Sequence, residues 1–173
     1  MSTNVYLAME LEKGGKILGS SKDKGHVNAV EVVSWSHGFS QPTTAATKSS
    51  DQQATSRANH SDLSFTKFFD NASSAILKAC WTGQQLKTAV FQMYRASGAT
   101  EVGTGATDYL TISLEDIIIS HYSISGGGDE LPIENITLNY TKCQYTFKGV
   151  VKEDSSVKAQ EPIIHDLATN EVK

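Results

Sequence analysis

The residue types that most often carry chemistry are present in this chain, but they are not spaced as they are in known sites. The five histidines are scattered, and none lies three to five residues from another histidine or from a cysteine. Zinc sites normally leave such a clustered spacing. We therefore expect no metal site, and structural or surface roles, for His26, His37, His60, His121 and His165.

The carboxylate, serine and cysteine residues also lack the pattern of a catalytic centre. Glu115 and Asp116 are adjacent, so on a regular strand they point to opposite faces and cannot share one acid–base task. We interpret Glu115 as a surface or inter-subunit partner and Asp116 as a bend residue. No Gly-x-Ser-x-Gly elbow occurs, and Cys80 and Cys143 have no CxxC partner. The sequence therefore predicts neither an enzyme nor a cofactor, unless the fold itself brings a His–carboxylate or Cys–His pair together.

Length and charge restrict the class of protein further. The chain has 173 residues, enough for one domain, and carries 15 Lys and Arg against 19 Asp and Glu, a net charge of −4. No basic stretch is interleaved with aromatic residues, which argues against a nucleic-acid partner. The apolar run 5–9 is ended by Glu10 and follows no positive segment. We therefore expect no cleavable signal peptide, no membrane insertion and synthesis as a soluble cytoplasmic chain.

Alternating apolar and polar residues indicate that strands dominate the fold. Trp35 is expected to anchor the core, and Phe65 lies on one apolar face of its strand. The Gly-rich turn 126–129 should join two long strands that pair with each other. Strands are predicted in six segments: 4–11, 30–39, 62–69, 86–95, 108–125 and 136–147.

A single helix interrupts this strand pattern. Several N-cap candidates stand between Asp70 and Ser74, and Gly83 is placed to end the helix in a left-handed conformation. The spacing i, i+1, i+4, i+5 predicts that one helical stripe packs on the core through Ile76, Leu77, Cys80 and Trp81.

Two polar segments complete the domain organisation. Residues 41–61 hold no large apolar residue and form a loop of unusual length, which is the first place to expect a partner contact. Residues 152–173 are charged and polar and should form a tail outside the core. The predicted fold is mainly β: an antiparallel β-barrel of residues 1–151 with one short α-helix and the extended loop 41–61.

Five segments in this order and spacing resemble the haemolysin-coregulated protein family, Hcp. The resemblance covers residues 4–148 and departs from the family at Trp81, where a small residue is expected, and in the tail. The segments are VEVVSWSHGF (30–39), SDLSFTK (61–67), LKAC (77–80) within the helix, LTISLEDI (110–117) and PIENITLNY (132–140).

The resemblance implies a structural subunit of the type VI secretion system. Members of the family form hexameric rings that stack into a hollow tube inside a contractile sheath, on a baseplate and under a VgrG-type spike. The tube is secreted and can carry small effector proteins in its lumen. We expect ring closure through two non-identical sides of the barrel. Ring stacking is expected through the extended loop, at Gln41, Pro42, Lys48, Asp51 and Arg57.

A second function remains open at this point. The chain could be a cargo-type or regulatory β-barrel module of the same secretion system that never enters a tube. Export that depends on the contractile machinery distinguishes the two functions.

Overall fold

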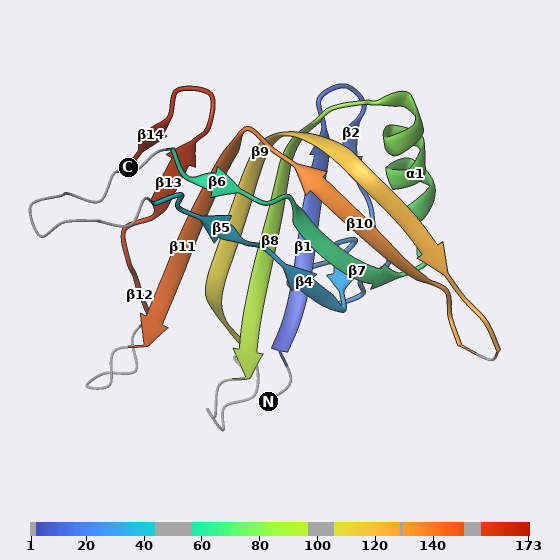
Figure 1. Ribbon diagram of the computed structural model, residues 1–173. Helices are drawn as coiled ribbons and strands as arrows, with labels where there is room; N and C mark the ends of the chain where they lie inside the picture. Colours follow the sequence, from blue (N-terminus) through green and yellow to red (C-terminus); the bar gives the residue numbers. More distant parts are fainter. Residues whose placement is uncertain (1–2, 44–56, 97–105, 129, 151–156) are drawn as a thin grey trace, which may run out of the picture.

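The computed structural model describes residues 3–43, 57–96, 106–128, 130–150 and 157–173 (Figure 1). These residues form antiparallel strands and one α-helix. The elements are β1 (Thr3–Leu11), β2 (Gly15–Ile17), β3 (Val30–Val32), β4 (Ser34–Ser36), β5 (Phe39–Ser40), β6 (Asn59–His60), β7 (Leu63–Phe68), α1 (Ser73–Thr82), β8 (Leu86–Ala96), β9 (Ala106–Ser125), β10 (Ile133–Asn139), β11 (Lys142–Val150), β12 (Val157–Ala159), β13 (Ile163–Asp166) and β14 (Glu171–Val172).

Strand β9 organises the sheet because each of its halves pairs with different partners. Its first half pairs with β8 on one side and β11 on the other, and its second half pairs with β10. The change occurs at Asp116, which has a positive φ of 51°. Opposite this bend the predicted strand 136–147 is broken at Tyr140 and Thr141, so the prediction of one continuous strand is wrong. The bend residue itself is where the sequence analysis placed it.

The chain turns a corner of the barrel at Val33. Strand β3 pairs with β1, whereas β4 pairs with β7, and between them the Val33 N–H donates to the Thr66 carbonyl over 2.8 Å. The predicted single strand 30–39 is therefore divided into β3, β4 and β5. Among the described residues, hydrogen-bonded strand pairs do not run without a break around the barrel. At this corner the two sides of the barrel are connected by the backbone that leads from β3 to β4.

The core lies between the two sides of this twisted sheet. Phe65 and Phe91 are fully buried and meet edge to face, with ring centroids 5.5 Å apart. Trp35 is half-buried and packs against the core. Aromatic pairs of this geometry add to the free energy gained from apolar burial.

Helix α1 covers one end of the sheet and ends as expected at Gly83, whose φ is 64°. Ile76 is fully buried, while Leu77 and Cys80 are half-buried. Trp81 is 78% exposed, so its predicted place in the core is wrong. Five residues after Ile76, it lies about 140° around the helix, which turns it away from the sheet.

The C-terminal segment also differs from the expected tail. Strand β13 pairs with β11 and with β14, and Leu167 packs against the core. Residues 160–173, here named the C-terminal extension, therefore belong to the same sheet as the barrel. Residues 152–156 lie outside the described residues.

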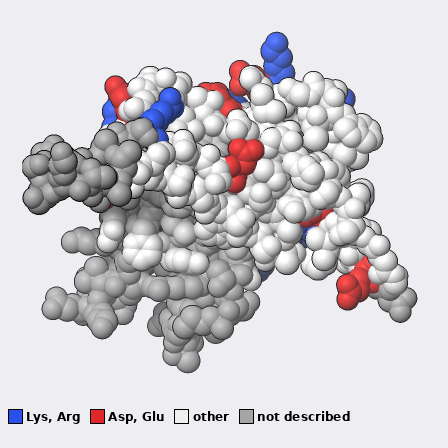
Figure 2. All heavy atoms as spheres, in the orientation of Figure 1, with Lys and Arg blue, Asp and Glu red and all other residues white. Residues whose placement is uncertain are grey.

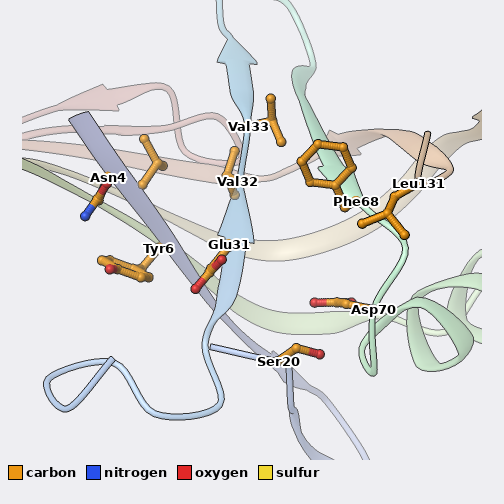
Figure 3. Close-up of a pocket in the computed structure, with 10 residues that line it drawn as sticks. Asn4, Tyr6, Ser20, Glu31, Val32, Val33, Phe68, Asp70 and Leu131 are labelled. Carbon is orange, nitrogen blue, oxygen red and sulfur yellow. The ribbon is translucent and has the colours of Figure 1, made fainter. Parts of the chain in front are cut away.

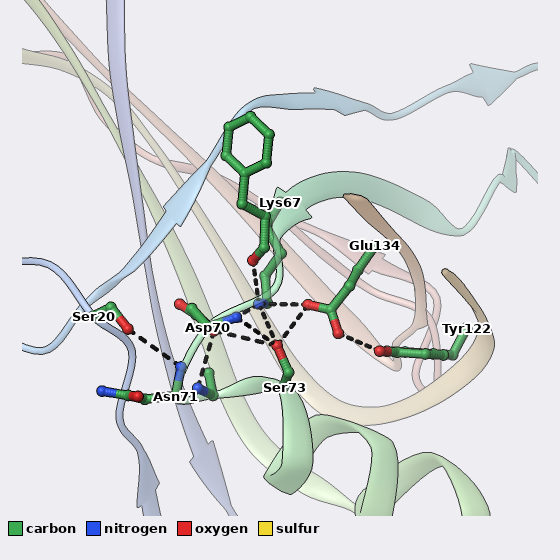
Figure 4. A network of polar contacts seen from close by, with 9 residues as sticks. Ser20, Lys67, Asp70, Asn71, Ser73, Tyr122 and Glu134 are labelled. Atoms are coloured by element: carbon green, nitrogen blue, oxygen red, sulfur yellow. Dashed lines mark hydrogen bonds and ion pairs between the residues drawn. The ribbon is translucent and has the colours of Figure 1, made fainter. Parts of the chain in front are cut away.

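A buried ion network fixes α1 to the sheet (Figure 4). The side chains of Lys67 and Glu134 are fully buried, with Lys67 Nζ 2.5 Å from Glu134 Oε2. The same ammonium donates to Asp70 Oδ1 over 2.6 Å and to Ser73 Oγ over 3.0 Å. Ser73 Oγ in turn donates to Glu134, and the Tyr122 hydroxyl donates to the other Glu134 oxygen. The network thus joins β7, the start of α1, β10 and β9.

Replacing Lys67 by Met should lower the free energy of unfolding by about 3–5 kcal/mol, because it leaves the Glu134 carboxylate buried without its countercharge. Urea unfolding followed by circular dichroism measures this change. The matched control is Lys78→Met on the exposed face of α1, where a change below about 0.5 kcal/mol is expected.

A double variant separates the two causes of this loss. Lys67→Met with Glu134→Met removes both charges, and it should be more stable than Lys67→Met alone. A Lys67→Met protein within about 1 kcal/mol of the unmodified chain would contradict the role given to the network.

Candidate functional site

A groove with an exposed apolar wall lies beside the corner at Val33 (Figure 3). It has a volume of about 470 Å³. Its apolar wall is formed by Val33, Phe68 and Leu131, which are 54%, 45% and 66% exposed. Its other side is polar, and Figure 3 shows Asn4, Tyr6 and Glu31 there. An exposed apolar surface with a polar rim is typical of a protein–protein contact.

Local structure explains why this groove is open. The change of sheet at Val33 turns its side chain outward between the buried Val32 and the half-buried Trp35. Across the groove, the Phe69 N–H donates to the Pro132 carbonyl over 3.0 Å and ties the end of β7 to the β9–β10 connection. These backbone constraints keep the apolar wall in place without burying it.

The groove borders the buried ion network through Asp70. Asp70 lines the groove, and its Oδ1 atom accepts hydrogen bonds from Lys67 Nζ and from the Ala72 N–H. The groove wall therefore borders a polar contact in which the lysine side chain is fully buried. The sequence analysis did not identify Val33, Phe68 or Leu131; the only signal was the pair of consecutive aromatic residues at 68–69.

The surface around the groove carries few charges. The described residues that line the groove include the carboxylates of Glu31 and Asp70 and no Lys or Arg, and on the face shown in Figure 2 the few visible Lys and Arg side chains form no large patch. Such a face offers no basic patch of the kind that binds a phosphate backbone. It is compatible with a protein partner.

The extended loop leaves the barrel through a short two-stranded base. Phe39 pairs with His60, and Ser40 with Asn59. Gln41 and Pro42 are exposed where the loop begins. Arg57, where the described chain resumes, donates to the Leu167 carbonyl of the C-terminal extension. The other two predicted stacking residues, Lys48 and Asp51, lie outside the described residues.

Three histidines that are far apart in sequence meet at this base. His37 Nδ1 lies 2.6 Å from the Tyr145 hydroxyl, and His37 Nε2 lies 2.5 Å from the Tyr140 hydroxyl. Tyr140 also bonds His60 Nδ1 at 2.8 Å, and His60 Nε2 lies 2.7 Å from His165 Nδ1. We name this row of five side chains the His–Tyr chain.

The chemistry of the His–Tyr chain is that of neutral groups. Burial, followed by the neighbouring His60, lowers the pKa of His37 to about 4. Burial also raises the pKa values of Tyr140 and Tyr145 and raises the pKa of the nearby Cys143 thiol to about 12. At neutral pH the cysteine is a thiol, whereas a nucleophile must be a thiolate.

Two features are absent from the part of the chain that the structure describes. No group of three or more His, Cys, Asp or Glu residues is arranged to hold a metal ion there. No helix there is both long enough and apolar enough to cross a membrane.

Comparison with known proteins identifies the family. Residues 6–147 match the model of the family described as type VI secretion system effector, Hcp. Protein hcp1 of Pseudomonas aeruginosa is 32% identical over 137 residues, which cover 79% of this chain and 80% of that protein. The major exported protein of the same organism is 31% identical over 128 residues, 69% of this chain and 70% of that protein.

The fold agrees with this result. A solved structure titled as a type six secretion system protein superposes with a TM-score of 0.82 at 24% identity, over 99% of this chain and all of that chain. The Hcp fold predicted from sequence is thereby confirmed. The chain belongs to the family of type VI secretion system effectors named Hcp.

Proposed function

We propose that this chain, a tube subunit of the type VI secretion system, closes into rings of six through the groove beside Val33. The observation that carries the proposal is an exposed apolar wall held in place by a buried ion network. Apolar surface of this kind is stabilised when a partner removes it from water.

The shape of the groove favours a ring over a symmetric pair. A concave surface is not complementary to itself, so it must receive a convex surface from elsewhere on the neighbouring copy. Such a contact is heterologous, and heterologous contacts generate rings when the rotation closes. The Glu31 carboxylate at the polar rim favours a neighbour that presents hydrogen-bond donors or a positive charge.

The stacking of rings is assigned to the extended loop. Its two-stranded base and the contact of Arg57 with the C-terminal extension support this role, because they fix the direction in which the loop leaves the barrel. We propose that Gln41, Pro42, Lys48 and Asp51 contact the next ring. Arg57 acts from within its own subunit.

The remaining partners follow from the family. We propose that the tube polymerises in the cytoplasm inside a contractile sheath on a baseplate, carries a VgrG-type spike, and holds small effector proteins in its lumen. The name of one relative, the major exported protein, supports export. The neutral His–Tyr chain and the protonated Cys143 thiol support a structural role without catalysis.

Replacing Val33 by Asp should abolish rings, because a carboxylate in the buried contact would lose its hydration and would lie near Glu31. Native mass spectrometry should show monomers in place of six-subunit rings. The matched control is Trp81→Asp, a second exposed apolar residue that lies outside the groove, and it should leave rings intact. Rings that persist in Val33→Asp would remove the groove from the proposal.

Replacing residues 46–54 by a short Gly-Ser linker should leave rings intact and abolish tubes and secretion. Negative-stain images of the purified protein and its amount in the culture medium measure the two effects. Unchanged secretion would contradict the stacking role. Absence of rings from the unmodified chain, with export unaffected by loss of the sheath, would favour the regulatory-module alternative.

A further inference from the structure

The His–Tyr chain joins three parts of the sequence that the barrel alone does not need to join. His37 follows β4, His60 ends the base of the extended loop, and His165 lies in β13 of the C-terminal extension. Tyr140 lies between β10 and β11, and Tyr145 lies in β11. The last link, between His60 and His165, is a side-chain hydrogen bond that connects the loop base to the extension, in addition to the bond from Arg57 to the Leu167 carbonyl.

This last link depends on the protonation of both rings. A neutral imidazole has one N–H donor and one acceptor nitrogen, whereas a protonated imidazole has two donors and no acceptor. The 2.7 Å distance between His60 Nε2 and His165 Nδ1 requires that one of these atoms donates and the other accepts. If both rings are charged, two N–H groups face each other and the bond cannot form.

We propose that the His–Tyr chain is an acid-sensitive contact that fastens the C-terminal extension to the base of the extended loop and releases it when His60 and His165 are both protonated. The second ring nitrogen of His165, Nε2, is buried without a hydrogen-bond partner. A charged His165 would therefore leave a buried N–H⁺ donor unpaired, which adds to the repulsion.

The surrounding groups do not neutralise the added charge. On the loop side Arg57 is positive and lowers the pKa of His60. The Asp62 carboxylate accepts hydrogen bonds from Ser120 and Asn139, and its charge raises the pKa of His37 but does not bond the His60 or His165 ring. On β11 and the β10–β11 connection, Tyr140, Tyr145 and Cys143 carry no charge at or below neutral pH, and burial raises their pKa values further.

The charged groups of the C-terminal extension and its neighbouring strand are engaged elsewhere. The Asp166 carboxylate accepts the N–H groups of Ala168 and Thr169, which lower its pKa. Lys142 on β11 pairs with Glu115, and Glu171 on β14 pairs with Lys173. No carboxylate among these described groups bonds a ring of the His–Tyr chain.

The direction of the pH effect follows from the lowered pKa values. Burial, then the charge of His165, then that of Arg57 lower the pKa of His60, and burial lowers that of His37 to about 4. Below about pH 6.5 the released His60 and His37 rings therefore bind more protons than the docked rings. The contact is fully stabilising above about pH 6.5 and weakens as the pH falls below that value.

The release should be local. Strand β13 has only four residues and pairs with β11 and β14. Ile163 on β13 and Val172 on β14 are exposed. Short exposed elements of this kind open at a lower free energy than the core. The β1–β8 pair, which has no histidine, should be unaffected.

Hydrogen exchange with mass spectrometry on the full chain tests the proposal, with rates corrected for the intrinsic effect of pH. Peptides covering residues 160–173 should lose protection by about tenfold or more between pH 7.5 and 4.5, since each pKa unit is a factor of ten. Peptides from β1 and β8 serve as the internal reference. The measurement does not depend on whether the chain assembles into rings or tubes.

Variants distinguish the His60–His165 link from a general effect of acid. His165→Phe removes one imidazole of this link, so the protection of residues 160–173 should change by less than about twofold over the same range. The matched control His121→Phe alters an exposed histidine that is not part of the His–Tyr chain, and its protection should change with pH as in the unmodified protein.

If residues 160–173 of His165→Phe are already unprotected at pH 7.5, the His60→Phe variant is used in its place. Its protection should likewise change by less than about twofold between pH 7.5 and 4.5. The proposal would be overturned if residues 160–173 of the unmodified chain were as protected at pH 4.5 as at pH 7.5. It would also be overturned if the variant whose extension is docked at pH 7.5 lost as much protection at pH 4.5 as the unmodified chain.

Discussion

The ion network around Lys67 is the constraint on which the rest of the structure depends. A lysine that is fully buried on the core face of β7 is stable only if its charge is compensated, and Glu134 and Asp70 supply that compensation from β10 and from the start of α1. Ser73 bonds the Lys67 ammonium and Tyr122 bonds the Glu134 carboxylate, so four elements are joined around one buried ion pair. An apolar core alone would not specify their relative positions so narrowly.

The same network determines where the chain can assemble. Phe68 directly follows Lys67 and is turned to the opposite face of β7, where it is half-exposed in the groove wall. Asp70 contributes to the network and to the lining of the groove. Lys67 of the ion network and Phe68 of the groove wall thus lie on opposite faces of β7. A tube subunit needs a contact surface of constant shape, because the same contact recurs between every pair of neighbouring subunits in a ring.

The sequence predicted what depends on local pattern and missed what depends on distant partners. Alternation located β1, β7, β8 and β9, the break in that alternation at Asp116 located the bend in β9, and Gly83 located the end of α1. Alternation puts Lys67 on the same face of β7 as Leu63 and Phe65, but it did not predict that the lysine is buried and could not name Glu134 as its partner. Trp81 was wrongly placed in the core because the apolar face predicted for the helix covered too wide an arc. The pairing of His60 with His165, 105 positions apart, left no signal in the spacing of the histidines.

Electron cryomicroscopy of the purified full chain tests the central claim most directly. The account predicts a six-subunit ring in which the groove beside Val33 of every subunit is covered by a different surface of the next, with Lys67, Glu134 and Asp70 still paired beneath it. Rings that leave this groove open to solvent, or single subunits at every concentration, would contradict the account.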